Sequence, residues 1–166
     1  MLLQNLRARM SARLSGDREA GFTLIELLVV MLILGILAAI AIPAFFNQRD
    51  KGTDAQAKAA VRTAQTAMET YATESGGTYA GVEVGDLEDI EPTLEDATLD
   101  IGATMALGVP DANAPGETNY AVAAQSDTGT WFTISRAGGQ VTFGCSDEGE
   151  GGCPDDGAAG QGDWSQ

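Results

Sequence analysis

The 166-residue chain contains no histidine. Histidine is the most frequent general base in enzymes and the most frequent nitrogen ligand of metals, so its absence removes the usual basis for either kind of site. The sequence also lacks a Gly-x-Ser-x-Gly motif, a phosphate-binding P-loop and a dinucleotide-binding glycine fingerprint. We therefore expect neither an enzyme nor a bound cofactor.

Basic side chains are scarce and unevenly placed. Residues 1–21 carry four basic and two acidic residues, a charge of +2, whereas residues 22–166 carry five basic and 22 acidic residues, a charge of −17. A surface this acidic repels phosphate backbones, so we expect no direct binding of nucleic acid. It also makes copies of the domain repel one another, so a polymer would need another source of cohesion.

Cysteine is nearly absent as well. Cys145 and Cys153 lie close together near the C-terminus. A metal site would need further cysteine or histidine ligands, and none lie nearby. In an exported domain a close pair of cysteines readily forms a disulfide, which we predict here.

The longest apolar run extends from Phe22 to Ile42 and contains one charged residue, Glu26. Its 21 residues match the roughly 20 that a helix needs to cross the hydrocarbon core of a bilayer. Pro43 follows directly and is predicted to kink or locally melt the helix. The arginine-bearing leader, residues 1–21, is expected to stay on the cytoplasmic side of the membrane.

A helical pattern resumes after Pro43, so that one long helix is predicted from Phe22 to Glu74. Its second half is amphipathic, and Gly76-Gly77 is expected to cap its C-terminus. The apolar residues of this half recur at three- and four-residue spacing, which places them on one stripe with the polar residues opposite. The stripe consists of Ala57, Ala60, Val61, Ala64, Met68 and Tyr71, and the opposite side of Lys58, Arg62, Gln65 and Glu69.

Three short alternating runs follow a glycine- and acid-rich connector at residues 78–118, which holds weak strand candidates near residues 98–108. Glycine-bearing turns separate the runs, as hairpins require. We predict an α+β fold in which a three- or four-stranded antiparallel meander packs its apolar face on the helix stripe. The runs are Asn119–Gln125, Thr130–Arg136 and Gln140–Cys145, with Tyr120, Val122, Phe132, Ile134, Val141 and Phe143 on the apolar face.

Four parts are expected along the chain. They are a cytoplasmic leader at 1–21, a transmembrane or filament-core helix at 22–42, a globular domain at 43–153 and a flexible acidic tail at 154–166. Two simpler interpretations of the first two parts are a secretory signal peptide cut near residues 38–41 and a single-pass anchor for a secreted domain. Neither explains Glu26, because a charge inside an apolar span costs roughly 2.5–3.5 kcal/mol.

The segment Gly21-Phe22-Thr23-Leu24-Ile25-Glu26, followed by the apolar run and Pro43, resembles the N-terminal signature of type IV prepilins and the related type II pseudopilins. The resemblance covers about residues 16–75. The leader is longer than in the commonest pilins that begin with phenylalanine, the acidic load is heavy, and no motif after residue 79 matches the family closely.

The resemblance implies a processing and assembly site. A prepilin peptidase would cut between Gly21 and Phe22 and methylate the new Phe22 amine. Glu26 would pair with that amine in its own chain or in a neighbour, and Pro43 occupies a position typical of the family. The chain would sit in the cytoplasmic membrane, pass to the pilus assembly machinery and polymerise with copies of itself into an extracellular filament.

The main alternative within the family is a pseudopilin of a type II secretion system or a minor pilin. Some pseudopilins bind calcium near the C-terminus, and acidic residues cluster around the two cysteines here. Their spacing matches no EF-hand loop, so a solvated acidic loop is the simpler interpretation and a calcium site the alternative. The cluster consists of Asp147, Glu148, Glu150, Asp155 and Asp156.

Overall fold

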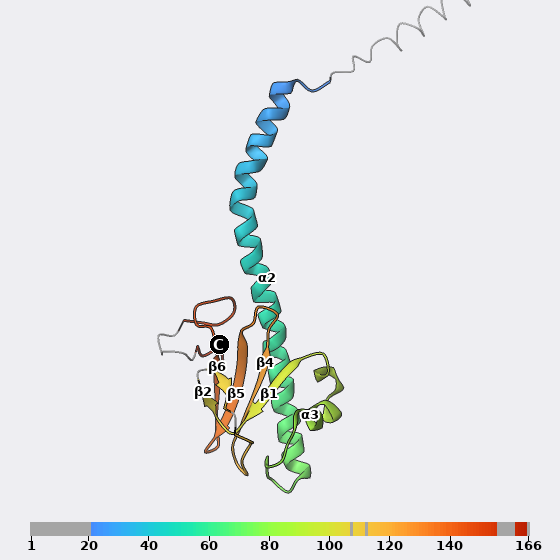
Figure 1. Cartoon of the computed structure of the whole chain (residues 1–166), viewed down its shortest axis with the longest axis vertical. Coiled ribbons are helices and arrows are strands. Elements are labelled where there is room, and N and C mark those ends of the chain that lie inside the picture. Colours follow the sequence, from blue (N-terminus) through green and yellow to red (C-terminus); the bar gives the residue numbers. More distant parts are fainter. Residues whose placement is uncertain (1–20, 107, 112, 156–161, 166) are drawn as a thin grey trace, which may run out of the picture. The chain divides into compact units, whose positions relative to one another are not determined.

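The computed structural model describes residues 21–106, 108–111, 113–155 and 162–165. The chain divides into two compact units, Met1–Ile42 and Pro43–Gln166. Helix α2, Leu24–Glu74, contributes 51 residues and belongs to both units (Figure 1). Pro43 lies inside it, and the helix is continuous there, so the predicted local melting does not occur.

The glycine pair ends helix α2 as predicted. Gly76 and Gly77 adopt positive φ angles of 76° and 94°, a region that residues with a Cβ rarely enter. The Gly77 N–H donates to the Ala72 carbonyl at 2.7 Å, which is the outer hydrogen bond of a Schellman motif. The chain therefore turns sharply after α2 and returns along the domain.

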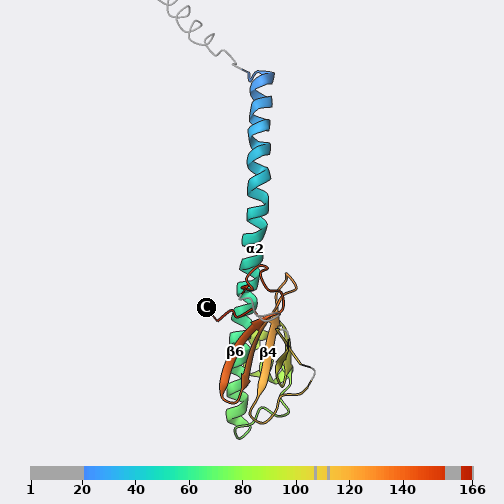
Figure 2. The ribbon, with the colours of Figure 1, turned by 90° about the vertical axis from the view of Figure 1, so that its left-hand side faces the viewer.

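The second unit contains an antiparallel four-stranded sheet in the order β1-β4-β5-β6 (Figures 1 and 2). The predicted α+β fold, a long helix packed by an antiparallel sheet, is confirmed. The last three strands form the predicted meander, and β1 joins the far side of β4. The strands are β1 Thr98–Gly102, β4 Tyr120–Gln125, β5 Trp131–Ala137 and β6 Gln140–Cys145, with a separate hairpin of β2 Met105–Ala106 and β3 Val109–Pro110.

The connector between α2 and β1 contains helices that the prediction missed. Helix α3 spans Val84–Ile90 and the 3-10 helix η1 spans Pro92–Leu94. The Glu83 N–H donates to Asp86 Oδ2 at 2.8 Å at the start of α3. Leu87 is fully buried and anchors α3 to the core. The acidic composition suggested a loop, but an acid three residues after the helix start is itself an N-terminal helix signal.

The core of the second unit lies between α2 and the sheet. Val61, Ala64 and Met68 are fully buried on the helix side, as the predicted stripe requires. Small alanines alternate with larger residues there, which lets the sheet approach the helix closely. Val141 departs from the prediction, because it lies on edge strand β6 and remains 40% exposed. The buried sheet residues that complete the cluster are Tyr120, Val122, Ala124, Phe132 and Ile134.

The polar side of the amphipathic half was predicted to lie opposite the core, and this is wrong for three residues. Lys58 Nζ lies 5.0 Å from the Phe132 ring centroid, and the Arg62 guanidinium lies 5.3 Å from that of Trp164. Long side chains at the flanks of a helix stripe can lay their stems along apolar surface and place their charge over an aromatic face. Helical periodicity gives the direction in which a side chain leaves the helix, but not how far a long side chain can extend around it.

Glu69 is the third exception, and it ties α2 to the sheet. Its carboxylate accepts hydrogen bonds from Tyr79 at 2.8 Å, from Tyr120 at 3.0 Å and from Arg136 at 2.7 Å. Burial raises the pKa of Glu69, but the hydrogen bonds from Tyr79, Arg136 and Tyr120 outweigh it and hold the pKa below its usual value. The ionised form is therefore the one that stabilises the fold.

We predict that Glu69→Gln removes part of the acid sensitivity of the domain. Because the pKa of Glu69 is lower in the folded state, its contribution is complete above the unfolded pKa near 4.5 and is lost as the pH falls through the folded value. The melting temperature of the wild type should exceed that of the variant at pH 6, and the gap should narrow below pH ~4. Parallel curves from pH 6 to pH 3 would contradict this role.

Candidate processing and assembly site

The N-terminal part of helix α2 buries none of its side chains within the chain. Every residue from 21 to 49 is exposed. Exposure reaches 85% for Phe22 and remains 47% for Val29, the least exposed of the large apolar residues in this segment. By length and composition α2 qualifies to cross a membrane, a criterion that N-terminal signal sequences also meet. This apolar surface therefore requires lipid or another protein to cover it.

Glu26 forms a capping box with Thr23 at the start of α2. The Glu26 N–H donates to Thr23 Oγ1 at 3.2 Å, which satisfies one of the helix-terminal donors. In return Glu26 Oε2 accepts from the Thr23 N–H at 3.2 Å and from its hydroxyl at 3.1 Å. The carboxylate thus has a structural partner in its own chain. Sequence reasoning missed this role, although Thr-x-x-Glu before an apolar run is its signature.

Nothing among the described residues requires glycine at position 21. A Cβ added there would meet none of their atoms within 4 Å. Its φ is not among the positive values found at other glycines. Any requirement for glycine at this position must therefore come from outside the described residues. Residues 1–20 of the predicted leader lie outside the described residues.

Pro43 and the residues after it continue the exposed surface into the second unit. Proline has no N–H, so the Ala39 carbonyl lacks its helical donor. Phe45 and Phe46 follow with exposures of 66% and 51%. Their rings lie 6.2 Å apart in an edge arrangement. The apolar surface thus extends one turn beyond the predicted boundary at Ile42.

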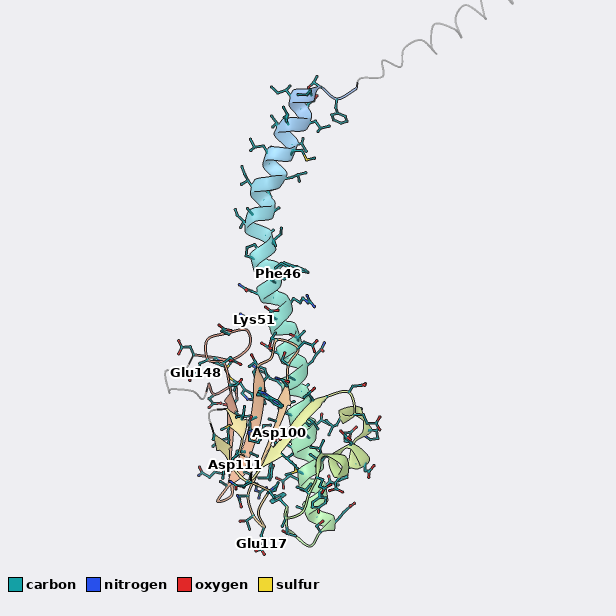
Figure 3. The ribbon with its side chains drawn as sticks, in the orientation of Figure 1. Phe46, Lys51, Asp100, Asp111, Glu117 and Glu148 are labelled. Carbon is teal, nitrogen blue, oxygen red and sulfur yellow. A yellow bond between two sulfur atoms is a disulfide. The ribbon has the colours of Figure 1, made fainter. Side chains whose placement is uncertain are left out.

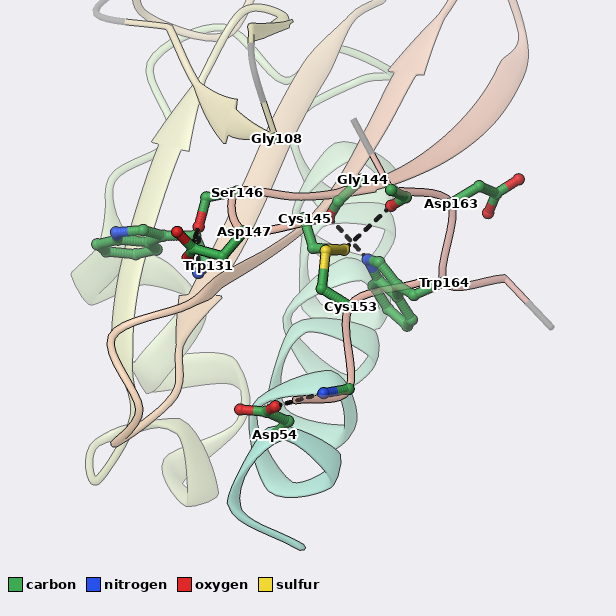
Figure 4. Close-up of a disulfide and its surroundings, with 12 residues drawn as sticks. Asp54, Gly108, Trp131, Gly144, Cys145, Ser146, Asp147, Cys153, Asp163 and Trp164 are labelled. Carbon is green, nitrogen blue, oxygen red and sulfur yellow. Dashed lines mark hydrogen bonds between the residues drawn. A yellow bond between two sulfur atoms is a disulfide. The ribbon is translucent and has the colours of Figure 1, made fainter. Parts of the chain in front are cut away.

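The predicted disulfide is confirmed. Cys145 at the end of β6 is bonded to Cys153, with 5.9 Å between their Cα atoms (Figure 4). Both cysteines are buried. On the loop-entropy account a closed loop this short adds roughly 2.5 kcal/mol to stability.

Asp54 attaches the disulfide loop to α2. It is fully buried, its Oδ2 accepts from the Gly152 N–H at 2.7 Å, and its Oδ1 accepts from the Thr128 hydroxyl at 2.8 Å. Gly151 has a φ of 54°, and a Cβ there would lie 2.3 Å from Asp54 Oδ2. One carboxylate therefore joins the helix, the β4–β5 turn and the disulfide loop, and its closeness requires glycine at 151.

The predicted flexible tail is wrong at its last described residues. Trp164 is only 2% exposed, and its indole N–H donates to the Gly144 carbonyl at 2.8 Å (Figure 4). Its ring lies 5.0 Å from that of Phe143 and 6.0 Å from that of Phe132. A Cβ on Gly162 would lie within 3.0 Å of both disulfide sulfurs. The glycine- and acid-rich composition of this segment predicted a flexible tail and gave no sign that Trp164 packs in the core.

The acidic loop around the disulfide forms no recognisable metal centre in the part of the chain that the structure describes. No group of three or more potential ligands gathers there or elsewhere in that part. Asp156, one of the residues predicted for a calcium site, lies outside the described residues. A calcium site therefore remains a prediction.

Comparison with known proteins agrees with these features. The prokaryotic N-terminal methylation motif matches residues 16–42. Type IV narrow pilus major component PilA5 of Thermus thermophilus is 33% identical over 121 residues, which are 73% of this chain and 90% of that protein. Type IV major pilin protein PilA of Myxococcus xanthus is 44% identical over 57 residues, 34% of this chain. Type II secretion system core protein G of Pectobacterium carotovorum is 35% identical over 57 residues, also 34% of this chain. No solved structure matches the chain significantly.

The match to the Thermus protein extends over most of both chains. Together with the α+β fold it shows that the chain belongs to the family of type IV pilins and type II secretion pseudopilins. The chain spans 26% of the Myxococcus relative and 36% of the Pectobacterium relative. Similarity to those two proteins is thus confined to about a third of this chain.

We predict that Trp164→Ala destabilises the domain by roughly 3–5 kcal/mol, because it leaves a cavity among buried rings and an unpaired Gly144 carbonyl. Denaturant unfolding of the full chain in detergent, followed by circular dichroism, measures this. Val141→Ala on the exposed edge strand is the control and should change stability by less than about 0.5 kcal/mol. Equal effects of the two substitutions would contradict the packing of Trp164 and support the predicted flexible tail.

Proposed function

We propose that this chain is the precursor of a type IV pilus subunit. A prepilin peptidase removes residues 1–21 and methylates the Phe22 amine, and copies of the mature chain then polymerise through α2. The observation that carries this proposal is the exposed apolar surface from Phe22 to Phe46 on a chain whose second unit packs a core of its own. A surface of this length is stable only in lipid or against other copies.

Two features support processing between Gly21 and Phe22. The methylation motif covers this junction. A Cβ on Gly21 would meet none of the described residues, and a residue without a side chain suits entry into a peptidase cleft. Cleavage there leaves Phe22 as the new N-terminus, one residue before the capping Thr23.

The membrane is the first environment of the exposed helix. The apolar run is long enough to span a bilayer, and the basic leader favours a cytoplasmic N-terminus with the domain outside. A buried disulfide suits the oxidising side of the membrane. Before assembly, the precursor is thus a single-pass membrane protein.

Polymerisation replaces lipid by neighbouring helices and so keeps the apolar surface out of water, where its exposure would cost roughly 25 cal/mol per Å². The helices form the core of the filament and the acidic domains face water. This arrangement explains how a chain with a charge of −17 after residue 21 polymerises, because cohesion comes from the apolar segment, in which Glu26 is the one charged residue.

The capping box already gives Glu26 a structural role, and pairing with the Phe22 amine would be a second one. The new Phe22 amine would be a positive charge next to the cap, and charge pairing reduces the cost of an intramembrane carboxylate. Pairing with the amine of a neighbour would also fix the axial offset between copies. Capping needs only an oxygen acceptor, whereas pairing needs the negative charge, so the two roles can be separated.

The second candidate is a pseudopilin of a type II secretion system. The similarity to a type II secretion core protein over 57 residues favours it. Processing and helix packing are shared by both candidates. The abundance of the subunit in surface filaments distinguishes them, because a major pilin dominates the material sheared from cells.

We predict that Glu26→Gln abolishes or strongly reduces filament assembly while leaving membrane insertion intact. Glutamine preserves the capping box, so its failure would isolate the charge. Thr23→Val is the matched control: it removes the cap, at about 1 kcal/mol, and keeps the charge. The measurement is the yield of sheared filaments from cells in which the variant is the only subunit, relative to subunit in the membrane.

Normal filaments from Glu26→Gln together with a loss in Thr23→Val would show that Glu26 acts as a helix cap alone. Absence of filaments from wild-type cells under any growth condition would contradict the pilus proposal itself.

A further inference from the structure

An aromatic–basic patch stands on α2 directly after the apolar run. It consists of Phe45, Phe46 and Arg49 (Phe46 is labelled in Figure 3). Arg49 follows Phe45 by four residues and Phe46 by three, so the three side chains share one face of the helix. Arg49 is exposed, and the one ion pair within 4 Å that the described residues form involves Arg136 and Glu69. The patch therefore offers rings and a positive charge that has no ion-pair partner among the described residues.

A cleft of about 310 Å³ lies elsewhere in the same unit. It is bounded by α2, by the link from η1 to β1 and by the end of β4. Four alanines line it together with threonine, serine and glutamine side chains, and two acidic residues give it charge. We call it the alanine-lined cleft, after Ala57, Ala60, Ala97 and Ala124, and its acidic residues are Asp96 and Asp127.

We infer that the alanine-lined cleft receives the aromatic–basic patch of a second copy of this chain. The patch cannot reach the cleft of its own chain, since Phe46 and Ala57 lie on one helix, about 16 Å apart along its axis at 1.5 Å per residue. The rings would rest against the alanines of the cleft, and Arg49 would approach Asp96 and Asp127, which are exposed and form no ion pair in the described structure. The charges of patch and cleft are complementary.

The charge distribution identifies a second copy as the partner. Residues 22–166 contain five basic side chains. Lys58 donates to the Gly152 carbonyl, Arg62 lies over Trp164 and Arg136 pairs with Glu69. Arg49 is one of the two that remain, and it stands beside the only exposed pair of large rings among the described residues of the second unit. Its natural counterpart is the acidic surface that every copy carries.

The contact is head to tail, because patch and cleft are different surfaces of one chain. Such heterologous contacts propagate into open polymers. The inference rests on the proposed filament and adds a contact between folded domains to it. Pairing of Glu26 with a neighbour's Phe22 amine implies that the two copies are shifted along the helix axis by about 6 Å. Contact between the patch of one copy and the cleft of another implies a shift of about 16 Å. The two contacts thus join different pairs of neighbours and can fail independently.

A charge exchange tests the inference in cells that carry the variant as the only subunit. Arg49→Asp alone, and Asp96→Arg with Asp127→Arg, should each lower the yield of sheared filaments roughly tenfold, because like charges then meet. Combining all three substitutions should restore most of the yield. Glu117→Arg is the control, an exposed acidic position at the other end of the domain (Figure 3), and it should behave as wild type.

A cysteine pair gives an independent measurement. Arg49→Cys with Asp96→Cys should yield a ladder of disulfide-linked subunits in filaments, since the native cysteines are already bonded to each other. Neither single variant, nor Arg49→Cys with Glu117→Cys, should form a ladder. Filaments without the ladder, or no rescue in the charge exchange, would overturn this contact and leave the proposed filament standing. Failure of the wild type to form filaments would instead contradict the proposed function.

Discussion

The rest of the structure depends on an apolar helical surface that the chain cannot bury by itself. The side chains from Phe22 to Phe46 are exposed, whereas the second unit packs a closed core of its own. Folding of the domain therefore leaves the apolar surface unsatisfied, and only lipid or other copies can cover it. The same helix provides the core face for the sheet and the exposed face for association, so one element serves both folding and assembly.

Two carboxylates on α2 accept hydrogen bonds from other elements and hold the domain together despite its negative charge. Glu69 joins the end of α2 to β4 and β5, and Asp54 joins its middle to the disulfide loop. Each carboxylate accepts several hydrogen bonds, which compensates for the cost of removing it from water. The other acidic residues that the structure describes are exposed or partly exposed, where they favour solubility and oppose association. We therefore expect cohesion between copies to come from the apolar segment and from the few basic residues without an ion pair in the described part of the chain.

The long helix, the meander and the disulfide could be predicted because each has a local signal. Glycine pairs end elements, apolar residues alternate at period two, and Cys145 and Cys153 lie close together in sequence. Features that depend on side-chain reach could not be predicted. Arg62 bends over Trp164, and Glu69 meets residues far away in sequence. Composition misled at Trp164, because its acidic surroundings gave no sign of the buried rings. The processing and assembly roles of Gly21, Phe22, Glu26 and Pro43 remain predictions.

The most direct test of the account is the intact mass of the subunit in filaments sheared from the cell surface. Cleavage between Gly21 and Phe22 predicts a chain of residues 22–166 that carries one N-terminal methyl group and one disulfide. Such a subunit retains the whole apolar surface that would hold the filament together. A mature chain that begins near Ala41 would have lost this surface. That result would contradict the account and identify the apolar run as an ordinary secretion signal.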